Sequence, residues 1–266
     1  MTVRLLTSIY CEQNPVRKHE LLQCLERNLH CSCIDEIWLL QEGNAQPPLQ
    51  HSKIRLLPVS RRPLYQDFFE SANRLCQSDS DLSIIANSDI YFDQTLGALA
   101  RVLLPRQCAA LSRWDLRPDG QPVLFDRSDS QDAWIFRGPI RTVLSNFCVG
   151  IPRCDNRILY ELRQAGYEVL NPAFSVRALH LHSGERSEYP GTISGAFVDP
   201  PYAYLFPTNL VSLPQYIAGR FCGQHTEFAW RVSPRMLDSY LLMRILRRLR
   251  TAIARGTKAG PERGLS

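Results

Sequence analysis

The chain has 266 residues, with 31 Lys or Arg against 26 Asp or Glu, and a net charge of +5. This length suits one large α/β domain, alone or with a small appendage, and the composition is that of a soluble globular protein. No apolar run reaches the ~20 residues that a membrane-spanning helix needs. The N-terminal stretch MTVRLLTSIY is too short and wrongly flanked for a signal peptide.

The nine cysteines are scattered along the chain, and an odd number cannot all form pairs. The sequence also lacks an Asn-x-Ser/Thr glycosylation site. Both features predict a cytoplasmic protein with reduced thiols. Cys31 and Cys33 lie next to His30, but no second pair of ligands follows at zinc spacing. A structural role for these cysteines is therefore the preferred interpretation.

Strand-like and helix-like segments alternate through the first part of the chain. Asn14-Pro15 predicts a helix start, because an amide side chain can cap the helix and proline fits its first turn. Pro63 opens a second helix that has apolar residues on one face. Short apolar runs predict buried strands at Val3–Tyr10, Ile37–Leu40, Ile54–Val59 and Leu82–Ala86.

The later part of the chain is less regular. Asp155-Asn156 opens a predicted helix that ends at Gly166. After residue 190 the sequence is rich in proline, glycine and aromatic residues, which predicts irregular structure. Extended segments are predicted at Ala109–Trp114, within Pro122–Phe136 and at Ser175–Leu181.

Strand–helix–strand repeats of this length predict a mostly parallel sheet covered by helices. In such sheets, ligands bind beyond the carboxyl ends of the strands. The polar run Asn87-Ser88-Asp89 directly follows the apolar run Leu82–Ala86. We therefore expect this polar run at the ligand-binding edge of the sheet and not in the core.

The sequence has no Gly-x-Gly-x-x-Gly loop, P-loop, His-Glu-x-x-His or Gly-x-Ser-x-Gly motif. A nucleotide bound by this sheet would need its phosphates held in another way, and a divalent cation on a carboxylate is the obvious substitute. Asp89 is the best candidate for that carboxylate, with Asn87 as an amide ligand or neighbouring group. The alternative is that Asp89 only caps the turn after its strand.

Two blocks of the sequence resemble glycosyltransferases of the GT-A fold that use nucleotide sugars. The block IIANSDIYFD, which contains Asp89, resembles their fourth strand and acidic metal-binding motif. The block GIPRCDNRILYELRQAGYEVLNPAFSVRALHLH, from Gly150 to His182, resembles the second half of the catalytic domain of inverting members. In that part of the family's domain an acid opens a helix and a later strand ends in histidine, which correspond here to Asp155 and to His180 or His182. The resemblance covers residues 1–190.

The resemblance implies a GT-A-like α/β fold that transfers a sugar, with inversion, from a nucleoside-diphosphate donor to a glycan or lipid-linked acceptor. It also implies Mn²⁺ or Mg²⁺ held by Asp89 and His182. His180 is the alternative ligand, because both histidines point to the same face of their strand. Asn87 and Cys154 depart from the family pattern, which has acids at those positions, and this leaves metal dependence open.

Asp155 is predicted to be the catalytic base. An inverting transfer needs one carboxylate to take the proton of the acceptor hydroxyl as it attacks, and the helix dipole helps to keep a carboxylate in the first turn ionised. The alternative is that Asp155 is only an N-cap. Asp132, in the polar cluster before Trp134, is a second catalytic candidate that would bind acceptor hydroxyls or replace Asp155 as base.

Recognition of the nucleotide is expected from the first part of the chain. Tyr10 and Glu12 follow the first strand and would approach the base. Glu42 ends the second strand, where it would accept a hydrogen bond from ribose or uracil. Arg62 and Asn73 lie before and on the helix that borders the predicted pocket.

The C-terminal segment 231–266 has nine Lys or Arg and two Asp or Glu, so the rest of the chain is close to neutral. Residues 235–255 predict a basic helix with one apolar stripe. This helix would rest on an anionic membrane surface at the cytoplasmic face or pack on the body as a solvated helix. A contact with nucleic acid is the least favoured interpretation, and no nucleic-acid partner is expected.

The predicted domains are a catalytic domain over 1–190, an irregular extension over 191–230 and a basic helix and tail over 231–266. Two alternatives to glycosyl transfer stay open. A sugar nucleotidyltransferase is disfavoured, because no glycine-rich basic signature follows the first strand. The second alternative is a non-catalytic module that binds nucleotide sugars or glycans. Its evidence is the departure from the family pattern at Asn87 and Cys154.

Overall fold

The computed structural model describes residues 1–43, 49–117, 119–181, 197–224, 229–232 and 245–246. The chain forms two compact units, Met1–Arg231 and Val232–Ser266. The labelled helices and strands all belong to the first unit. In the second unit Ile245 and Leu246 are helical and exposed. Most of the basic helix predicted over residues 235–255 lies outside the described residues.

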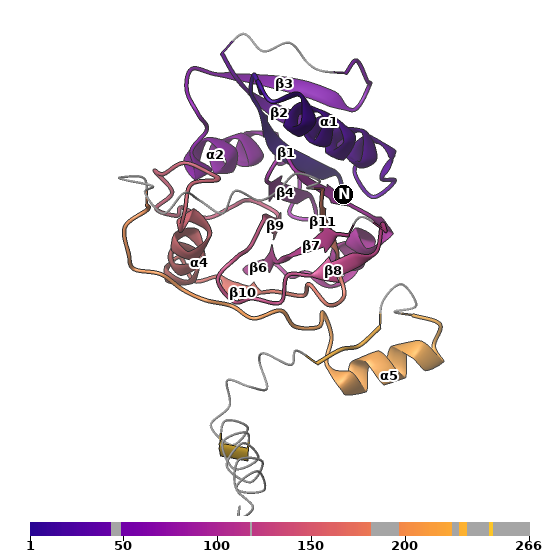
Figure 1. Cartoon of the computed structure of the whole chain (residues 1–266). Helices are drawn as coiled ribbons and strands as arrows, with labels where there is room; N and C mark the ends of the chain where they lie inside the picture. The colour runs from indigo at the N-terminus through magenta and orange to yellow at the C-terminus, as the bar shows by residue number, and fades with distance from the viewer. Residues whose placement is uncertain (44–48, 118, 182–196, 225–228, 233–244, 247–266) are drawn as a thin grey trace, which may run out of the picture. The chain divides into compact units, whose positions relative to one another are not determined.

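A seven-stranded sheet forms the centre of the first unit (Figure 1). All neighbouring strands in it are parallel except at β9, which runs antiparallel to both of its neighbours, β4 and β6. The predicted class, a mostly parallel α/β sheet flanked by helices, is confirmed. In spatial order the strands are β10 (Glu168–Leu170), β6 (Gln107–Leu111), β9 (Ala133–Arg137), β4 (Leu82–Ala86), β1 (Val3–Ile9), β2 (Glu36–Glu42) and β3 (Ile54–Val59).

A smaller, four-stranded sheet adjoins the central one, and two of its strands directly continue central strands. β5 follows β4 after the turn at residues 87–89, and β7 follows β6 after Ser112. The predicted strand Ala109–Trp114 is therefore divided between two sheets. In spatial order the strands of the small sheet are β5 (Ile90–Phe92), β11 (Ala178–His180), β7 (Arg113–Leu116) and β8 (Pro122–Leu124).

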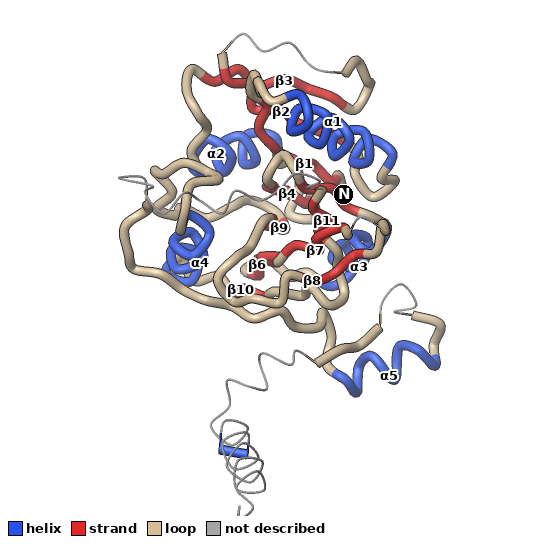
Figure 2. The backbone as a smooth tube through the Cα atoms, viewed as in Figure 1, coloured by secondary structure: helices blue, strands red, loops and turns tan. Residues whose placement is uncertain are grey.

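Figure 2 shows the helices in blue. Some of them begin at a signal that is readable in the sequence, and others do not. At the start of α1, Asn14 Oδ1 accepts from the backbone N–H groups of Val16 and Arg17 at 2.9 and 3.2 Å, as predicted for a cap. α5 lies where irregular structure was predicted, and Ser212 and Gln215 form a capping box there. The helices of the described residues are α1 (Pro15–His30), α2 (Tyr65–Leu75), α3 (Gly97–Val102), α4 (Cys154–Gln164) and α5 (Leu213–Phe221), with a 3-10 turn at Gln94–Leu96.

The central sheet has an apolar core on each face, because side chains alternate along every strand. In β4, Leu82, Ile84 and Ala86 pack in the core that α1 and α3 cover, while Ile85 packs in the core that α2 and α4 cover. Every residue of β4 is buried. The prediction that the run before Asn87 is a buried strand is therefore confirmed, and the polar turn that follows it leaves the core at the sheet edge.

Residues 197–212, called the 197–212 segment here, contain neither helix nor strand and lie against the loop before β9. The backbone N–H of Leu205 donates to Ser128 O at 2.8 Å. Leu205 O accepts from Gln131 Nε2 at 3.3 Å and from Asn171 Nδ2 at 3.2 Å. Since Gln131 and Asn171 are fully buried, the 197–212 segment fixes the position of this loop.

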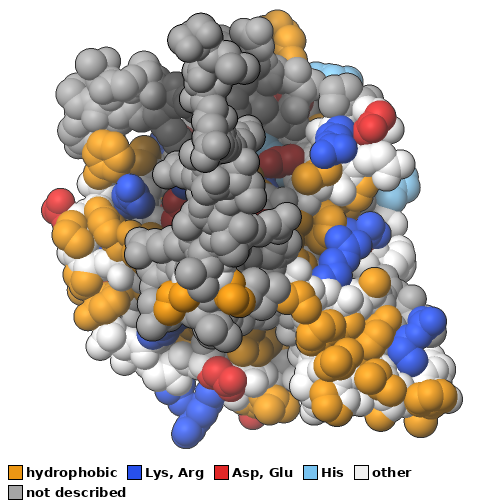
Figure 3. All heavy atoms as spheres, turned by 60° about the horizontal axis from the view of Figure 1, so that its bottom comes forward, with side chains coloured by type: hydrophobic (Ala, Val, Ile, Leu, Met, Phe, Trp, Pro, Cys, Tyr) orange, Lys and Arg blue, Asp and Glu red, His pale blue; other side chains and the backbone are white. Residues whose placement is uncertain are grey.

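Several large apolar side chains remain on the surface of the first unit. On α5, Leu213, Ile217 and Phe221 are exposed, the last by 89%. Figure 3 shows hydrophobic side chains over much of the face that it presents, with Lys and Arg side chains among them. None of the helices in the described part of the chain combines the length and the apolar character needed to cross a bilayer.

Candidate active site

A cavity of about 1060 Å³ opens at the carboxyl edge of the central sheet. This volume is at the upper end for small-molecule sites, which reach about 1,000 Å³. Because β9 runs antiparallel, Asp132 just before it lies at the edge where the parallel strands end, and the N–H of Asn87 donates to Asp132 O at 3.1 Å. The residues that end or follow β1, β2 and β4 in this lining are Ser8, Tyr10, Glu42, Asn87, Ser88 and Asp89.

Asp89 is paired on two sides within the cavity. Its Oδ2 forms an ion pair with Arg17 Nη2 from α1 and lies 3.3 Å from His180 Nε2 at the end of β11. Burial opposes ionisation of Asp89, but the hydrogen bond and charge of His180, and then the charge of Arg17, hold the pKa of the carboxyl well below its ordinary value. Asp89 Oδ1 is buried and has no hydrogen-bond partner among the described residues.

His180 is held between two carboxylates. Its Nδ1 lies 2.7 Å from Asp115 Oδ1 on β7, which turns Nε2 toward Asp89. Burial lowers the pKa of His180, but the hydrogen bonds to Asp115 and Asp89 outweigh it and raise the pKa to about 9. The imidazole is therefore protonated at neutral pH in this arrangement, and Asp115 also accepts from Arg113 Nε at 2.9 Å.

Asp132 is buried at the middle of the cavity. Its Oδ1 accepts from Asn87 Nδ2 at 3.1 Å, and both of its oxygens lie 3.3 Å from Arg113 Nη1. Burial raises the pKa of Asp132 above its ordinary value, and the charge of Arg113 opposes that rise. Arg113 therefore connects Asp132 to Asp115, and through Asp115 to His180.

Asp155 is the second residue of α4, and Arg153 is the N-cap. The alternative that Asp155 is merely an N-cap is therefore wrong. Its carboxylate accepts from the backbone N–H of Asn156 at 3.0 Å and from that of Gln131 at 3.3 Å. Burial, and next the nearby charge of Asp132, raise the pKa of Asp155 to about 7. This carboxyl can therefore gain and lose a proton near neutral pH.

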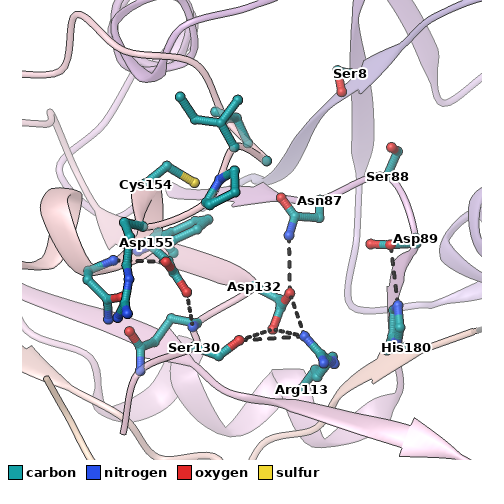
Figure 4. Close-up of a pocket in the computed structure, with 18 of the residues that line it drawn as sticks. Ser8, Asn87, Ser88, Asp89, Arg113, Ser130, Asp132, Cys154, Asp155 and His180 are labelled. Carbon is teal, nitrogen blue, oxygen red and sulfur yellow. Dashed lines mark hydrogen bonds and ion pairs between the residues drawn. The ribbon is translucent and has the colours of Figure 1, made fainter. Parts of the chain in front are cut away.

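The three carboxylates share the cavity, and Figure 4 shows Asp132 between Asp155 on one side and Asp89 on the other. The pKa shifts agree with this order. The charge of Asp132 raises the pKa of Asp155, and the charge of Asp89 raises the pKa of Asp132. Asp89 stands with the cations Arg17 and His180, whereas Asp155 stands at the start of α4. The cavity thus has a charge-paired side and a side with a titratable acid.

The other residues predicted for the site fall into two groups. Tyr10, Glu42 and Arg62 line the cavity, and Arg62 Nε donates to Val149 O at 3.1 Å. Glu12 is not among the lining residues, and its Oε1 accepts from the backbone of the α1 cap at 2.8 Å.

Asn73 is also absent from the cavity lining. Its amide makes two bonds to the backbone of Ile140, from Nδ2 to O at 2.8 Å and to Oδ1 from N at 2.7 Å. Glu12 and Asn73 thus bond backbone groups that lie outside the cavity lining, and we do not assign them to ligand binding. His182 lies outside the described residues, whereas its alternative, His180, lines the cavity.

Sequence reasoning missed Arg17, Arg113 and Asp115. Arg17 lies in the first turn of α1, where an arginine is ordinarily solvated, and its partner Asp89 is distant in sequence. Arg113 and Asp115 did carry a signal, because their alternation predicts that both lie on one face of β7. That signal becomes useful only once the parallel pairing of His180 with Asp115 is known.

Asp89 and His180 have side chains of the kinds that ligate a divalent cation, and His180 would have to release its Nε2 proton to do so. The Oδ1 atom of Asp89 is buried without a partner among the described residues. Asp115 lies on Nδ1 of His180, and a carboxylate on the nitrogen that faces away from the metal commonly orients a ligating histidine. No group of three or more His, Cys, Asp or Glu side chains in the described ranges forms a metal site. A cation here would need oxygens from substrate phosphates and water, as Mg²⁺ and Mn²⁺ commonly do.

No protein-family model and no curated protein sequence matches the chain. Among solved structures, it is similar to the mannosyltransferase PcManGT from Pyrobaculum calidifontis in complex with GDP-Man and Mn²⁺, with 12% identity, TM-score 0.42, and 70% of this chain and 58% of that chain covered. It is similar to S. aureus TarS residues 1–349, with 8% identity, TM-score 0.40, and coverage of 78% and 60%.

A further similar structure is the 2-C-methyl-D-erythritol 4-phosphate cytidylyltransferase IspD from Francisella tularensis, with 11% identity, TM-score 0.36, and coverage of 52% and 73%. The chain thus spans less than two thirds of the length of the mannosyltransferase and of the TarS fragment. These likenesses agree with the α/β fold described above. At such TM-scores they carry no argument about what this chain binds or does.

Proposed function

We propose that this protein is a glycosyltransferase that moves a sugar, with inversion, from a nucleoside-diphosphate donor to an acceptor hydroxyl. The observation that carries the proposal is the placement of Asp89 and Asp155 on one cavity with Asp132 between them. The charge-paired side, where Arg17 and His180 can donate to a diphosphate, faces an acid that titrates near neutral pH. Such a pairing is what a single displacement at a sugar carbon requires.

The donor is assigned to the cavity side formed by the ends of β1, β2 and β4. Tyr10 and Glu42 are placed to contact the nucleoside, and Arg62 adds a positive charge to the lining. Arg17 and the protonated His180 supply charge for the leaving diphosphate. A divalent cation held by Asp89 and His180 would, when bound, take the place of the Nε2 proton of His180 and supply that counter-charge to the diphosphate instead.

Asp155 is the proposed general base. As the acceptor oxygen forms its bond to the anomeric carbon, the bond from that carbon to the donor phosphate breaks, and the acceptor proton passes to the Asp155 carboxylate. A base is most effective when its pKa lies near the working pH. The pKa of about 7 meets this condition, and an aspartate at its ordinary value of 3.8 would be a far weaker base.

Asp132 is assigned a positioning role and not that of the base. It is already bonded to Arg113 and Asn87, so its carboxylate is committed within the protein. Its charge also raises the pKa of Asp155. Asp132 therefore keeps the turn after β4 in place and makes Asp155 more basic. The acceptor class proposed is a glycan or lipid-linked hydroxyl.

The proposal is tested with the full-length chain and a panel of UDP-, GDP- and CDP-sugars, with and without Mn²⁺ or Mg²⁺. Nucleotide binding is measured by calorimetry, and transfer or donor hydrolysis by release of the nucleoside diphosphate. We expect Asp155→Asn to bind nucleotide as the wild type does and to lower turnover by about 10²–10⁴-fold, the usual contribution of a general base. Asp89→Asn should lose the gain in affinity that the metal gives.

Asp119→Asn is the matched control, because this carboxylate lies outside the cavity lining and, among the described residues, accepts only from the backbone N–H of Gln121 in a turn. Nucleotide binding without any turnover, unchanged in Asp155→Asn, would contradict transfer and identify a binding module. Release of pyrophosphate from a nucleoside triphosphate and a sugar phosphate would identify a nucleotidyltransferase instead.

A further inference from the structure

Trp134 carries a buried hydrogen-bond donor that the described residues do not pair. The side chain is 1% exposed and lines the cavity, and its Nε1 atom has no partner among the described residues. The other three tryptophans each donate this N–H to a protein oxygen: Trp38 to Glu36 Oε2 at 2.9 Å, Trp114 to Ala173 O at 2.8 Å and Trp230 to Val211 O at 3.2 Å. Of the four, the tryptophan without an acceptor in the described chain is thus the one in the cavity lining.

The indole of Trp134 is held in one orientation by its neighbours. Its ring meets that of Tyr65 edge to face, with the two centroids 5.1 Å apart. Both rings are almost fully buried in the core that α2 and α4 cover. Because such a core is close-packed, the indole cannot turn its N–H toward another acceptor without displacing these neighbours.

Gln131, three residues earlier, offers an unpaired acceptor in the same cavity lining. Its Nε2 donates to Ser128 O at 3.4 Å and to Leu205 O at 3.3 Å, which fixes the amide and turns Oε1 away from both carbonyl groups. Gln131 is 1% exposed, and its Oε1 has no partner in the described part of the chain. The backbone N–H of the same residue donates to Asp155 Oδ2 at 3.3 Å. The acceptor atom therefore belongs to a residue that is bonded to the proposed base.

One unpaired atom donates and the other accepts, and this decides which ligand they suit. A buried polar atom without a partner costs about 1–3 kcal/mol, so such atoms are ordinarily bonded to the chain, to ordered water or to a ligand. An oxyanion only accepts, and the charge of Asp132 next to Asp155 would repel it. A hydroxyl group both donates and accepts and carries no charge. The two atoms therefore suit neutral hydroxyl groups.

We propose that Trp134 Nε1 and Gln131 Oε1 bind hydroxyl groups of the acceptor other than the one that attacks, so that the acceptor is a sugar and not a simple alcohol. The inference rests on the proposed function and deepens it, because it names the acceptor class. These hydroxyl groups are assigned to the acceptor and not to the donor because Gln131 is bonded to Asp155, and the base stands beside the acceptor. Both residues orient the acceptor and take no part in proton transfer.

The first test observes the indole N–H groups of the full-length chain, labelled with ¹⁵N, by NMR while saturating UDP and Mg²⁺ occupy the donor side. The chain has four tryptophans, and replacing each by Phe in turn assigns the four signals. The probes are the methyl glycosides of glucose, galactose, mannose and N-acetylglucosamine, with methanol as the single-hydroxyl control. At least one glycoside should shift the Trp134 signal and leave that of Trp38 in place. No shift with any glycoside, or the same shift with methanol, would overturn the proposal.

The second test measures kinetics with a donor and an acceptor sugar that show turnover. Trp134→Phe keeps an aromatic ring and removes the N–H, so the acceptor KM should rise about tenfold, the upper range for one hydrogen bond, while the donor KM stays unchanged. Trp38→Phe is the matched control, because its N–H is bonded to Glu36 outside the cavity lining, and it should leave the acceptor KM as it is. Equal changes of acceptor KM in both variants would contradict the assignment.

Deoxy analogues of that acceptor identify the bound hydroxyl group. Removing the hydroxyl that Trp134 binds should raise the acceptor KM about tenfold in the wild type and little further in Trp134→Phe, because its partner is already gone. Losses that multiply for every analogue would overturn the proposal, and a rise in donor KM alone would overturn the assignment to the acceptor. A shifted Trp134 signal without turnover of any nucleotide sugar would fail the proposed function and leave the sugar site standing.

Discussion

Replacing Asp155 by Asn should change how stability depends on pH, whatever the substrate is. The pKa of Asp155 in the folded protein is about 7, against an ordinary value of 3.8, mainly because the carboxyl is buried. Between these two values the folded chain keeps a proton that the unfolded chain has lost. Stability therefore falls as pH rises through this window and levels off above the folded pKa.

The size of the effect follows from the same shift. One pKa unit corresponds to about 1.4 kcal/mol, so raising the pH from about 5 to about 8 should cost the wild type about 3 kcal/mol relative to the variant. Asn has nearly the same shape and no charge, so its contribution does not vary with pH. If the Asn side chain loses the hydrogen bond from Gln131 N, the loss of stability is the same at both pH values. It therefore cancels when the change in stability from about pH 5 to about pH 8 is compared between variant and wild type.

Urea unfolding of the wild type and of Asp155→Asn at these two pH values gives the difference directly. The variant should gain stability relative to the wild type at the higher pH while losing transfer activity. Equal pH dependence of the two proteins would refute the reasoning, because it would mean that Asp155 ionises in the folded chain as it does in water. The proposed base would then lose its main electrostatic support.

Three further predictions concern other features of the first unit. Gly138→Ala should lower the free energy of unfolding by about 2–4 kcal/mol in thermal unfolding, because its φ is +67° and a Cβ would lie 3.2 Å from Asp79 O. Gly120→Ala is the control: its φ is also positive but the space around it is open, so it should lower that free energy by only about 1–2 kcal/mol. Asn28→Ala should lower the free energy of unfolding by about 2–4 kcal/mol in the same assay, because this buried amide bonds Ile90 O and Phe92 N of β5 at 2.9 and 3.0 Å. A loss no larger than that of a surface substitution would contradict a stabilising role for these two bonds. Transfer activity should rise with pH and level off above about pH 7 as Asp155 ionises, and a rate that falls over this range would exclude it as base.

Strands β1, β2, β3 and β4 of the central sheet were predictable because each contains a short apolar run, whereas the short edge strand β10 was not predicted. The position of Asn87 and Asp89 at the sheet edge followed from this pattern and from the rule for parallel sheets. The reversed direction of β9 did not follow, because Trp134 and its neighbours read as buried in either direction. That reversal brings Asp132 to the edge, so its contact with Asn87 could be found only in the structure.

The charge partners of the site were harder to predict than its acids. Arg17 pairs with a residue 72 positions away, and nothing local marks it off from a solvated helix arginine. The start of α4 was predicted at Asp155-Asn156, but the helix begins at Cys154 after the left-handed Arg153. A left-handed arginine is a rare conformation that no residue pattern announces. The roles of Tyr10, Glu42 and Arg62 stay predictions.

The 197–212 segment has a consequence for how this protein can change over evolutionary time. Leu205 holds the loop before β9 only through its main-chain N–H and C=O groups, which every amino acid except proline provides in full. The hydrogen bonds made at this position therefore depend little on the identity of its side chain, whereas Val198 and Ala203 of the same segment are buried in the core and constrained by packing. Replacements at exposed positions such as Tyr204 can therefore accumulate while the loop that carries Gln131 and Asp132 keeps its place.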